Sequence, residues 1–454
     1  MINLNLMNLS ILSISIITAI LGTVLFKKAA GNLNPVTINP ISGAYYFLLL
    51  LSVLGTTLFM VGITHHTSRY MKHHDMKIIA WLTVLVLFIV FPAIIIALNK
   101  IFKFDTSRNT DYLLKEVSIH EASNAEFITM VIATIVVVGA VIYTYVTIGI
   151  LNSPIYNMII GTDPVELAKL RNMADAGFPG NQYIKNIFAI ALTPFISYIA
   201  YIYMRKTKEK RWIILFVILF IASNLIAFYN IQKAPIIIYW GSFVILSIYY
   251  GDKISLKHIL AIGIISVIAI IAMYTVITDA PLKKTLSFNG PMNRIIMTTP
   301  SAYILHLEVF TYRTDLLNGA SLPNPIGRLL LGHPSVIRSG RVVMETINFL
   351  GIRLGTSGVY NGLFLGEAFA NFGKWGIFAS MLHIPIVFFV VNLIFNKLKK
   401  TPITVALFTF WTVNLLFTLN GGYTDYIFSM IWTLVTLTGV AMSVFTWLLR
   451  KIRI

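Results

Sequence analysis

The sequence predicts an all-α integral membrane protein with about eleven transmembrane helices, within a range of about 10–13. Two observations support this fold class. First, 57% of the 454 residues are hydrophobic and only 11% are charged, whereas soluble chains are about 25% charged. Second, uncharged apolar runs such as 78–98 and 258–278 match the ~20 residues that a helix needs to cross about 30 Å of hydrocarbon. A soluble enzyme and a disordered protein are therefore excluded, and the absence of cysteine excludes disulfides and thiol chemistry.

Each apolar run is expected to form one span of a single transmembrane domain that covers residues 1–454. The first run is longer than the apolar part of a typical secretion signal, and Lys27 and Lys28 follow it without a clear cleavage site, so we expect a span there too. In chain order the expected spans are 9–26, 42–62, 78–98, 127–151, 187–204, 212–229, 235–250, 258–278, 375–396, 402–419 and 426–449.

Short basic connections predict the orientation of the spans. These basic segments are 205–211, 253–257, 397–400 and 450–453. Because lysine and arginine concentrate on the cytoplasmic side, the C-terminus is expected to be cytoplasmic. The connections 152–186 and 279–374 are then external. The net charge of +18 is assigned to this anchoring, and no nucleic-acid partner is expected.

The N-terminal half gives two conflicting indications. The connection 63–77 is rich in histidine and also carries Arg69, Lys72 and Lys77, which is typical of a cytoplasmic loop. The connection 99–126 carries five acidic residues and has the charge of an external loop. Strict alternation counted back from the basic segment 205–211 places both connections on the opposite sides, so both orientations stay open.

The large external connection, 279–374, is the main candidate for a functional region. Six of the eight basic residues in 279–373 are arginine, and the planar guanidinium group can donate two parallel hydrogen bonds to phosphate oxygens. A phosphate-bearing substrate is therefore expected, although salt bridges and lipid headgroup contacts are the alternative. The candidate arginines of this connection are Arg294, Arg313, Arg338, Arg341 and Arg353.

The same connection has internal structure. The segments 295–310 and 341–354 show apolar residues at roughly helical spacing and are expected to form amphipathic helices on the membrane surface. The segment 319–340 is rich in glycine and proline and is expected to be a loop. His333 lies in this loop and is a candidate base near neutral pH, although a turn histidine without a catalytic role is the simpler interpretation.

Glu367 is the most unusual residue of the connection. It lies in an otherwise apolar stretch just before a span, where a carboxylate is costly unless it is used. Asn371 follows four residues later and is therefore expected on the same helix face. A buried carboxylate at this position would suit general-base chemistry. The alternative is a salt bridge to an arginine of the loop.

The run Gly366–Gly373, GEAFANFG, resembles the Wzy-type polymerases that join O-antigen and exopolysaccharide repeat units. Asn39-Pro40 at the second span, Asn293-Arg294 and Tyr303 fit the same pattern. The resemblance implies a GT-C-like glycosyltransferase of the bacterial inner membrane. Such an enzyme transfers a growing glycan from undecaprenyl pyrophosphate onto a new lipid-linked repeat unit at the external face.

The resemblance also implies roles for individual residues. Arg171, in the connection 152–186, and Lys233, in a tight turn between two spans, would bind the pyrophosphate together with Arg294 and Arg313; on residue type alone, Lys233 would only reach toward the membrane interface. Glu367, with His333 in reserve, would be the base, and Asn371 and Tyr303 would be further site residues.

The expected partners are the lipid-linked donor and acceptor and the membrane lipids, and a chain-length regulator would be an additional one. No cofactor and no metal are expected, because the sequence lacks the Asp-x-Asp pair that would hold a divalent metal on a nucleotide sugar. Two alternatives stay open. One is an O-antigen ligase-like glycosyltransferase, which uses the same donor but another acceptor. The other is a flippase or other transporter of lipid-linked oligosaccharides, which would place charged residues inside several spans.

Overall fold

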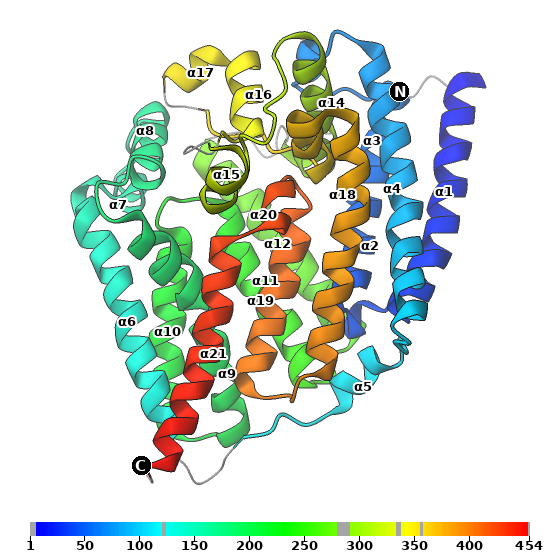
Figure 1. Ribbon diagram of the computed structural model, residues 1–454. Helices are drawn as coiled ribbons and strands as arrows, with labels where there is room; N and C mark the ends of the chain where they lie inside the picture. The colour runs from blue at the N-terminus through cyan, green and yellow to red at the C-terminus, as the bar shows by residue number, and fades with distance from the viewer. Residues whose placement is uncertain (1–5, 120–123, 279–290, 333–336, 355–356, 453–454) are drawn as a thin grey trace. The chain divides into compact units, whose positions relative to one another are not determined.

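The computed structural model describes residues 6–119, 124–278, 291–332, 337–354 and 357–452 (Figure 1). Every regular element within these ranges is helical. Nine helical segments of the described chain are long and apolar enough to cross a membrane, which supports a protein that crosses the membrane several times. They are Leu6–Thr37, Pro40–Met60, His74–Ile101, Ala125–Ile148, Ile184–Thr207, Lys210–Phe228, Lys233–Tyr250, Phe364–Lys397 and Tyr423–Lys451.

The two other expected spans fall on the helices Leu256–Thr278 and Pro402–Thr418, in which the apolar stretches Leu256–Ile265 and Pro402–Thr418 are shorter than the nine above. Each of them begins close to the position that the hydropathy predicts, at 258 and 402. Ten of the predicted runs thus coincide closely with helical segments, whereas the run 426–449 is interrupted between the helices Tyr423–Ile427 and Met430–Lys451. Nine helical segments reach the length and apolar character of a membrane span within the described residues.

The chain forms two compact units, and each unit combines segments that lie far apart in the sequence. Unit 1 consists of Met1–Thr110, Ile271–Asn396 and Asn414–Ser429, and unit 2 consists of Asp111–Ile270, Lys397–Val413 and Met430–Ile454. Three helices have several residues in each unit, α5 (Arg108–Leu114), α12 (Leu256–Thr278) and α19 (Pro402–Thr418), and α18 (Phe364–Lys397) has its last residue in unit 2. Neither unit is therefore a contiguous domain.

Unit 1 contains the first helices and most of the large connection. Its helices are α1 (Leu6–Ala30), α2 (Pro40–Leu48), α3 (Leu54–Met60), α4 (His74–Ile101), α14 (Pro291–Tyr312), α15 (Asn324–Leu331), α16 (Ser339–Ile347), α17 (Phe349–Arg353), α18 (Phe364–Lys397) and α20 (Tyr423–Ile427). Asn39 starts α2, because its side chain accepts the N–H groups of Ile41 and Ser42 in a capping box ahead of Pro40. A π-helical turn, Leu49–Val53, then joins α2 to α3.

The helix α14 lies in the interior of unit 1. All residues from Thr299 to Phe310 are buried, and Pro300 packs so closely on α3 that a side chain at Gly55 would collide with it. The amphipathic surface helix expected over 295–310 is therefore a buried helix. The polar residues that produced its amphipathic pattern, such as His306 and Glu308, have partners inside the unit.

The helix α18 is broken at Phe372 and Gly373. Gly373 has φ 58° and ψ −148°, a conformation that is essentially restricted to glycine. The break separates a short first half, residues 364–371, from the longer second half. It leaves the carbonyl of Ala370 free of its helical partner, and the N–H of Leu317 binds that carbonyl at 2.8 Å.

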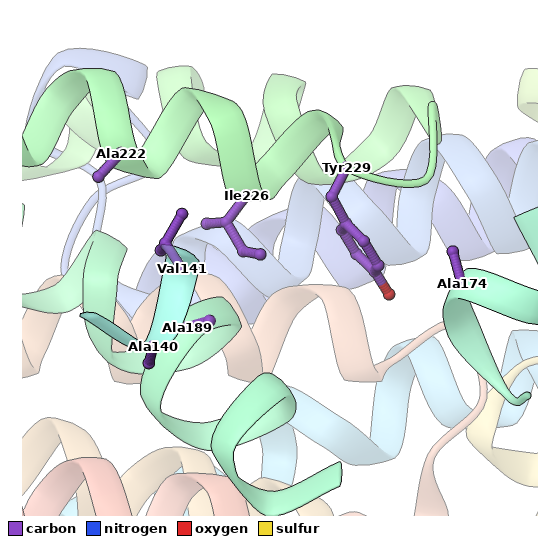
Figure 2. Packing of buried hydrophobic residues seen from close by; sticks show 7 residues of the cluster. All are labelled: Ala140, Val141, Ala174, Ala189, Ala222, Ile226 and Tyr229. Carbon is purple, nitrogen blue, oxygen red and sulfur yellow. The ribbon is translucent and has the colours of Figure 1, made fainter. Parts of the chain in front are cut away.

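Unit 2 contains α6 (Ala125–Ile148), α7 (Pro154–Ile159), α8 (Pro164–Asp175), α9 (Thr193–Thr207), α10 (Lys210–Phe228), α11 (Lys233–Tyr250) and α21 (Met430–Lys451). A π-helical segment, Ile184–Leu192, leads into α9. Four alanines contribute to a core between α6, α8, α10 and the π-helical segment (Figure 2), and small residues allow close helix packing in membranes. The core residues are Ala140, Val141, Ala174, Ala189, Ala222, Ile226 and Tyr229.

Contacts in each unit bear on the unresolved orientation of 63–77 and 99–126. In unit 2, Glu116 forms a salt bridge with Lys206, and Glu126 forms one with Arg450. The acidic residues thus lie beside the basic segments 205–211 and 450–453. In unit 1, the backbone of Lys72 binds α14 of the large connection. Which side of the membrane each connection faces stays a prediction.

Candidate functional site

Glu367 lies in the first half of α18, and its side chain is buried, with 7% of the residue exposed. Its Oε2 accepts the backbone N–H of Thr424 at 3.0 Å and the hydroxyl of Thr424 at 3.2 Å. Thr424 is in the first turn of α20, so the carboxylate caps that helix. Oε1 accepts no hydrogen bond from the described residues, and this oxygen is free to accept a proton.

Two further charged residues accompany Glu367. Asp425, the next residue in α20, is half-buried, and Arg338 is exposed at the N-terminus of α16. Asp425 interacts electrostatically with Glu367, and Arg338 interacts with both carboxylates. The site therefore combines two carboxylates with one guanidinium group. Arg338 was predicted from the sequence, whereas Asp425 was not.

Asn371 holds the first half of α18 in place. Its Nδ2 donates to the carbonyl oxygen of Glu367 at 2.8 Å, and its Oδ1 accepts the N–H of Ser321 at 3.2 Å. Glu367 and Asn371 thus lie on one face of the helix, as the spacing predicts. Because Asn371 is fully buried, its role in the structure is to fix the loop at Ser321 against the break in α18.

His306 is buried beneath this site and was not predicted from the sequence. Its Nδ1 lies 2.7 Å from the carbonyl oxygen of Ala302, which can only accept, so Nδ1 carries the proton. Its Nε2 then accepts the hydroxyl of Ser339 at 3.2 Å. Burial lowers the pKa of His306 to about 4, so the ring is neutral at pH 7. Side chains at Gly362 and Gly366 would both press on this ring.

Tyr303 and Arg313 have structural partners in unit 1. The hydroxyl of Tyr303 is 2.8 Å from the hydroxyl of Thr83 in α4. Arg313 donates to Glu308 at 2.6 Å and to the carbonyl of Tyr70 at 2.8 Å. Since Glu308 is fully buried, Arg313 neutralises an internal carboxylate, which competes with its expected role in phosphate binding.

The other arginines of the large connection differ in their surroundings. Arg341 pairs with Glu345 on the surface of α16, where both side chains are nearly half exposed. Arg353 is exposed at the end of α17. Arg338, Arg341 and Arg353 are thus accessible to an anion. The side chain of Arg294 in α14, and His333 as a whole, lie outside the described residues.

The two pyrophosphate-binding candidates of unit 2, Arg171 and Lys233, both lie at the turn between α10 and α11. The Nε of Arg171, in α8, donates to the carbonyl oxygen of Asn230 at 3.1 Å, and Lys233 starts α11 three residues later. Burial lowers the pKa of Arg171, and the nearby Asp175 partly offsets that effect. The structure thus groups the candidates into one set in unit 1 and another in unit 2.

Lys185 is a buried cation in unit 2 that was not predicted from the sequence. It donates to the carbonyls of Ala174 and Asp175 at 3.3 and 2.5 Å, and so closes the C-terminal end of α8. Its Nζ also lies 4.9 Å from the ring centre of Phe178. A lysine in an apolar run gives only a weak signal for this role. Asp425, in contrast, is an acidic residue just before an apolar run, the same signal that identified Glu367.

The described residues contain no group of three or more histidine, aspartate or glutamate side chains that could hold a metal ion. The arrangement places the buried carboxylate of Glu367 close to a second carboxylate, Asp425, and to the exposed Arg338. No protein-family model matches the chain, and neither a curated protein nor a solved structure is significantly similar to it.

Proposed function

We propose that the protein is a glycosyltransferase of the bacterial inner membrane that polymerises lipid-linked repeat units of a surface polysaccharide. One observation carries the proposal: the buried carboxylate of Glu367, whose Oε1 accepts no hydrogen bond from the part of the chain that the structure describes, lies beside Asp425 and Arg338 and before a helix break. A buried carboxylate is costly unless it is paired or used. In this site two neutral donors, the N–H and the hydroxyl of Thr424, bind the same oxygen of Glu367, Oε2.

The proposed reaction uses Glu367 as the base. A hydroxyl of the acceptor sugar attacks the anomeric carbon of the donor and forms the new C–O bond, while the bond from that carbon to the pyrophosphate breaks. The hydroxyl proton passes to Oε1 of Glu367, and the pyrophosphate leaves with the bonding electrons. Such a transfer needs cations on the leaving group. Arg338, Arg341 and Arg353 are accessible for this role in unit 1, and Arg171 and Lys233 are candidates in unit 2.

In this proposal the C-terminus is cytoplasmic, and the large connection faces the outside. The donor and acceptor are repeat units on undecaprenyl pyrophosphate, and the architecture is GT-C-like. The positive charge of the segments 205–211 and 450–453 supports this orientation.

Gene deletion in the native bacterium, followed by complementation, tests the proposal. Deletion is expected to leave single repeat units on the outer face and to remove long glycans. The Glu367→Gln variant should fail to restore them at normal protein abundance, because the amide oxygen still caps α20. Glu345→Gln is the matched control, since Glu345 lies on the surface of α16, and it should restore the glycans fully.

Three outcomes would contradict the proposal in different ways. Long glycans that remain on the lipid carrier after deletion would indicate a ligase. Repeat units trapped on the cytoplasmic face would indicate a flippase. Full activity of Glu367→Gln, with deletion still abolishing polymer, would remove only the assignment of the base.

A further inference from the structure

The helix α15 has an apolar face that points away from unit 1. A helix turns about 100° per residue, so Gly327 and Leu331 share one side. This side faces the protein, because Gly327 is buried and Leu331 lies against Gly319. Leu329, of which 80% is exposed, lies on the opposite side, and Leu330, of which 66% is exposed, lies on the flank between the two sides.

The exposed face is apolar over a wide arc. Pro325 and Ile326 lie on the same side as Leu329 and Leu330, one turn earlier, whereas Asn324 and Arg328 lie at its edge. An arc of this width is typical of helices that bury one face. In the described structure the residues of unit 1 bury the narrow side with Gly327, and the apolar arc is left uncovered.

The position of α15 indicates what covers this arc. Gly319, which contacts Leu331, is also close to Phe372 at the break in α18, at 3.6 Å from an added Cβ. The second half of α18 starts directly after the break with Lys374 and Trp375, and Trp375 is 71% exposed. Exposed tryptophan at the start of a span is typical of the membrane interface. The apolar arc of α15 thus lies next to the end of a lipid-facing span.

We propose that α15 lies in the membrane interface beside Trp375, with Leu329 and Leu330 among the acyl chains and Arg328 at the phosphates of anionic phospholipids. Interfacial helices combine an apolar face with basic residues at its edge in this way. The ends of the stretch that carries α15 are tied together, since Ile337 donates to Ala320 at 2.9 Å and accepts from Ser321 at 2.6 Å. Lipid contact at α15 therefore anchors the loop that leads to Arg338 and that Asn371 holds at Ser321. The proposal does not depend on the proposed reaction.

Site-specific labelling tests the proposal, because the chain has no cysteine of its own. We would prepare Leu329→Cys and Asn324→Cys, attach the fluorophore NBD, and reconstitute each protein in nanodiscs of phosphatidylethanolamine and phosphatidylglycerol. Asn324 is exposed at the polar edge of the same helix and is the matched control. The label at 329 should be quenched several-fold more by lipid-borne nitroxide, and several-fold less by aqueous iodide, than the label at 324. Equal iodide quenching at both positions would overturn the proposal.

Two further measurements separate the lipid from other partners. Nanodiscs that hold a single copy of the protein should give the same lipid quenching at position 329 as nanodiscs that hold two. Protection that requires two copies would assign the face to a second copy of the chain instead and would overturn the proposal. Replacing phosphatidylglycerol with phosphatidylcholine should reduce the quenching by nitroxide, because Arg328 then loses its anionic partner; unchanged quenching would contradict the role of Arg328.

Discussion

The buried salt bridge between Glu308 and Arg313 allows a quantitative prediction. Glu308 is fully buried and accepts the backbone N–H groups of Lys72 and His73 as well as the guanidinium of Arg313. Removing one partner of a buried ion pair typically costs about 3–5 kcal/mol. Because Arg313 remains partly exposed, its charge keeps some hydration, and we expect the lower end of that range. Glu308→Ala should therefore lower the free energy of unfolding by about 3 kcal/mol.

The exposed pair Arg341–Glu345 is the control for this prediction. Both of its side chains are nearly half exposed, and exposed ion pairs of this kind contribute about 0–1 kcal/mol to the free energy of unfolding. Thermal unfolding in detergent, followed by fluorescence-detected gel filtration, would compare Glu308→Ala with Glu345→Ala. Proteolysis within 62–73 should also increase in Glu308→Ala, because that segment loses its anchor. Equal stability of the two variants would refute the reasoning.

Three further predictions concern unit 1. Gly373→Ala should destabilise the protein by about 1–3 kcal/mol and reduce polymer formation, because alanine disfavours the conformation at the break; unfolding and glycan analysis would show both effects. Gly55→Leu should cost about 1–3 kcal/mol, since an added Cβ would lie 2.4 Å from Pro300 and 2.6 Å from the carbonyl of Ile296; unchanged thermal unfolding would contradict this packing. His306 is neutral in the folded protein, with a pKa near 4. As the pH falls from 6.5 to 4, the unfolded chain gains a proton at this histidine before the folded chain does, so the free energy of unfolding should decrease by about 3 kcal/mol; above pH 6.5 this loss is absent. His306→Gln should remove that pH dependence of unfolding.

The membrane spans could be predicted because they depend on local composition. A run of apolar residues long enough to cross the bilayer forms a helix whatever surrounds it. The break in α18 depends instead on a single backbone conformation at Gly373, and the sequence around it reads as a continuous helix. The burial of α14 was missed for a related reason: its amphipathic pattern reflects polar partners inside the protein and not contact with water.

The candidate site was predictable in part. Glu367 was identified because a carboxylate in an apolar run is unusual, and the same argument applies to Asp425. The sequence alone could not show which arginines are available to bind phosphate, since Arg313 and Arg338 are the same residue type in the same connection. Only the fold shows that Arg313 neutralises the buried Glu308 while Arg338 is exposed near two carboxylates.

The interleaving of the two units has a consequence for biosynthesis. Unit 1 begins with Met1–Thr110 but also requires Asn414–Ser429, and Thr424 of that late segment caps Glu367. At about 5–20 residues per second, the ribosome needs roughly 15–60 s to make the ~300 residues in between. During this time the first helices wait in the membrane without their final neighbours. Glu367 itself is followed by Thr424 57 residues later, so after its synthesis the carboxylate lacks its cap for about 3–11 s. A nascent chain is therefore expected to depend on protection by the insertion machinery, and the site matures only when translation is almost finished.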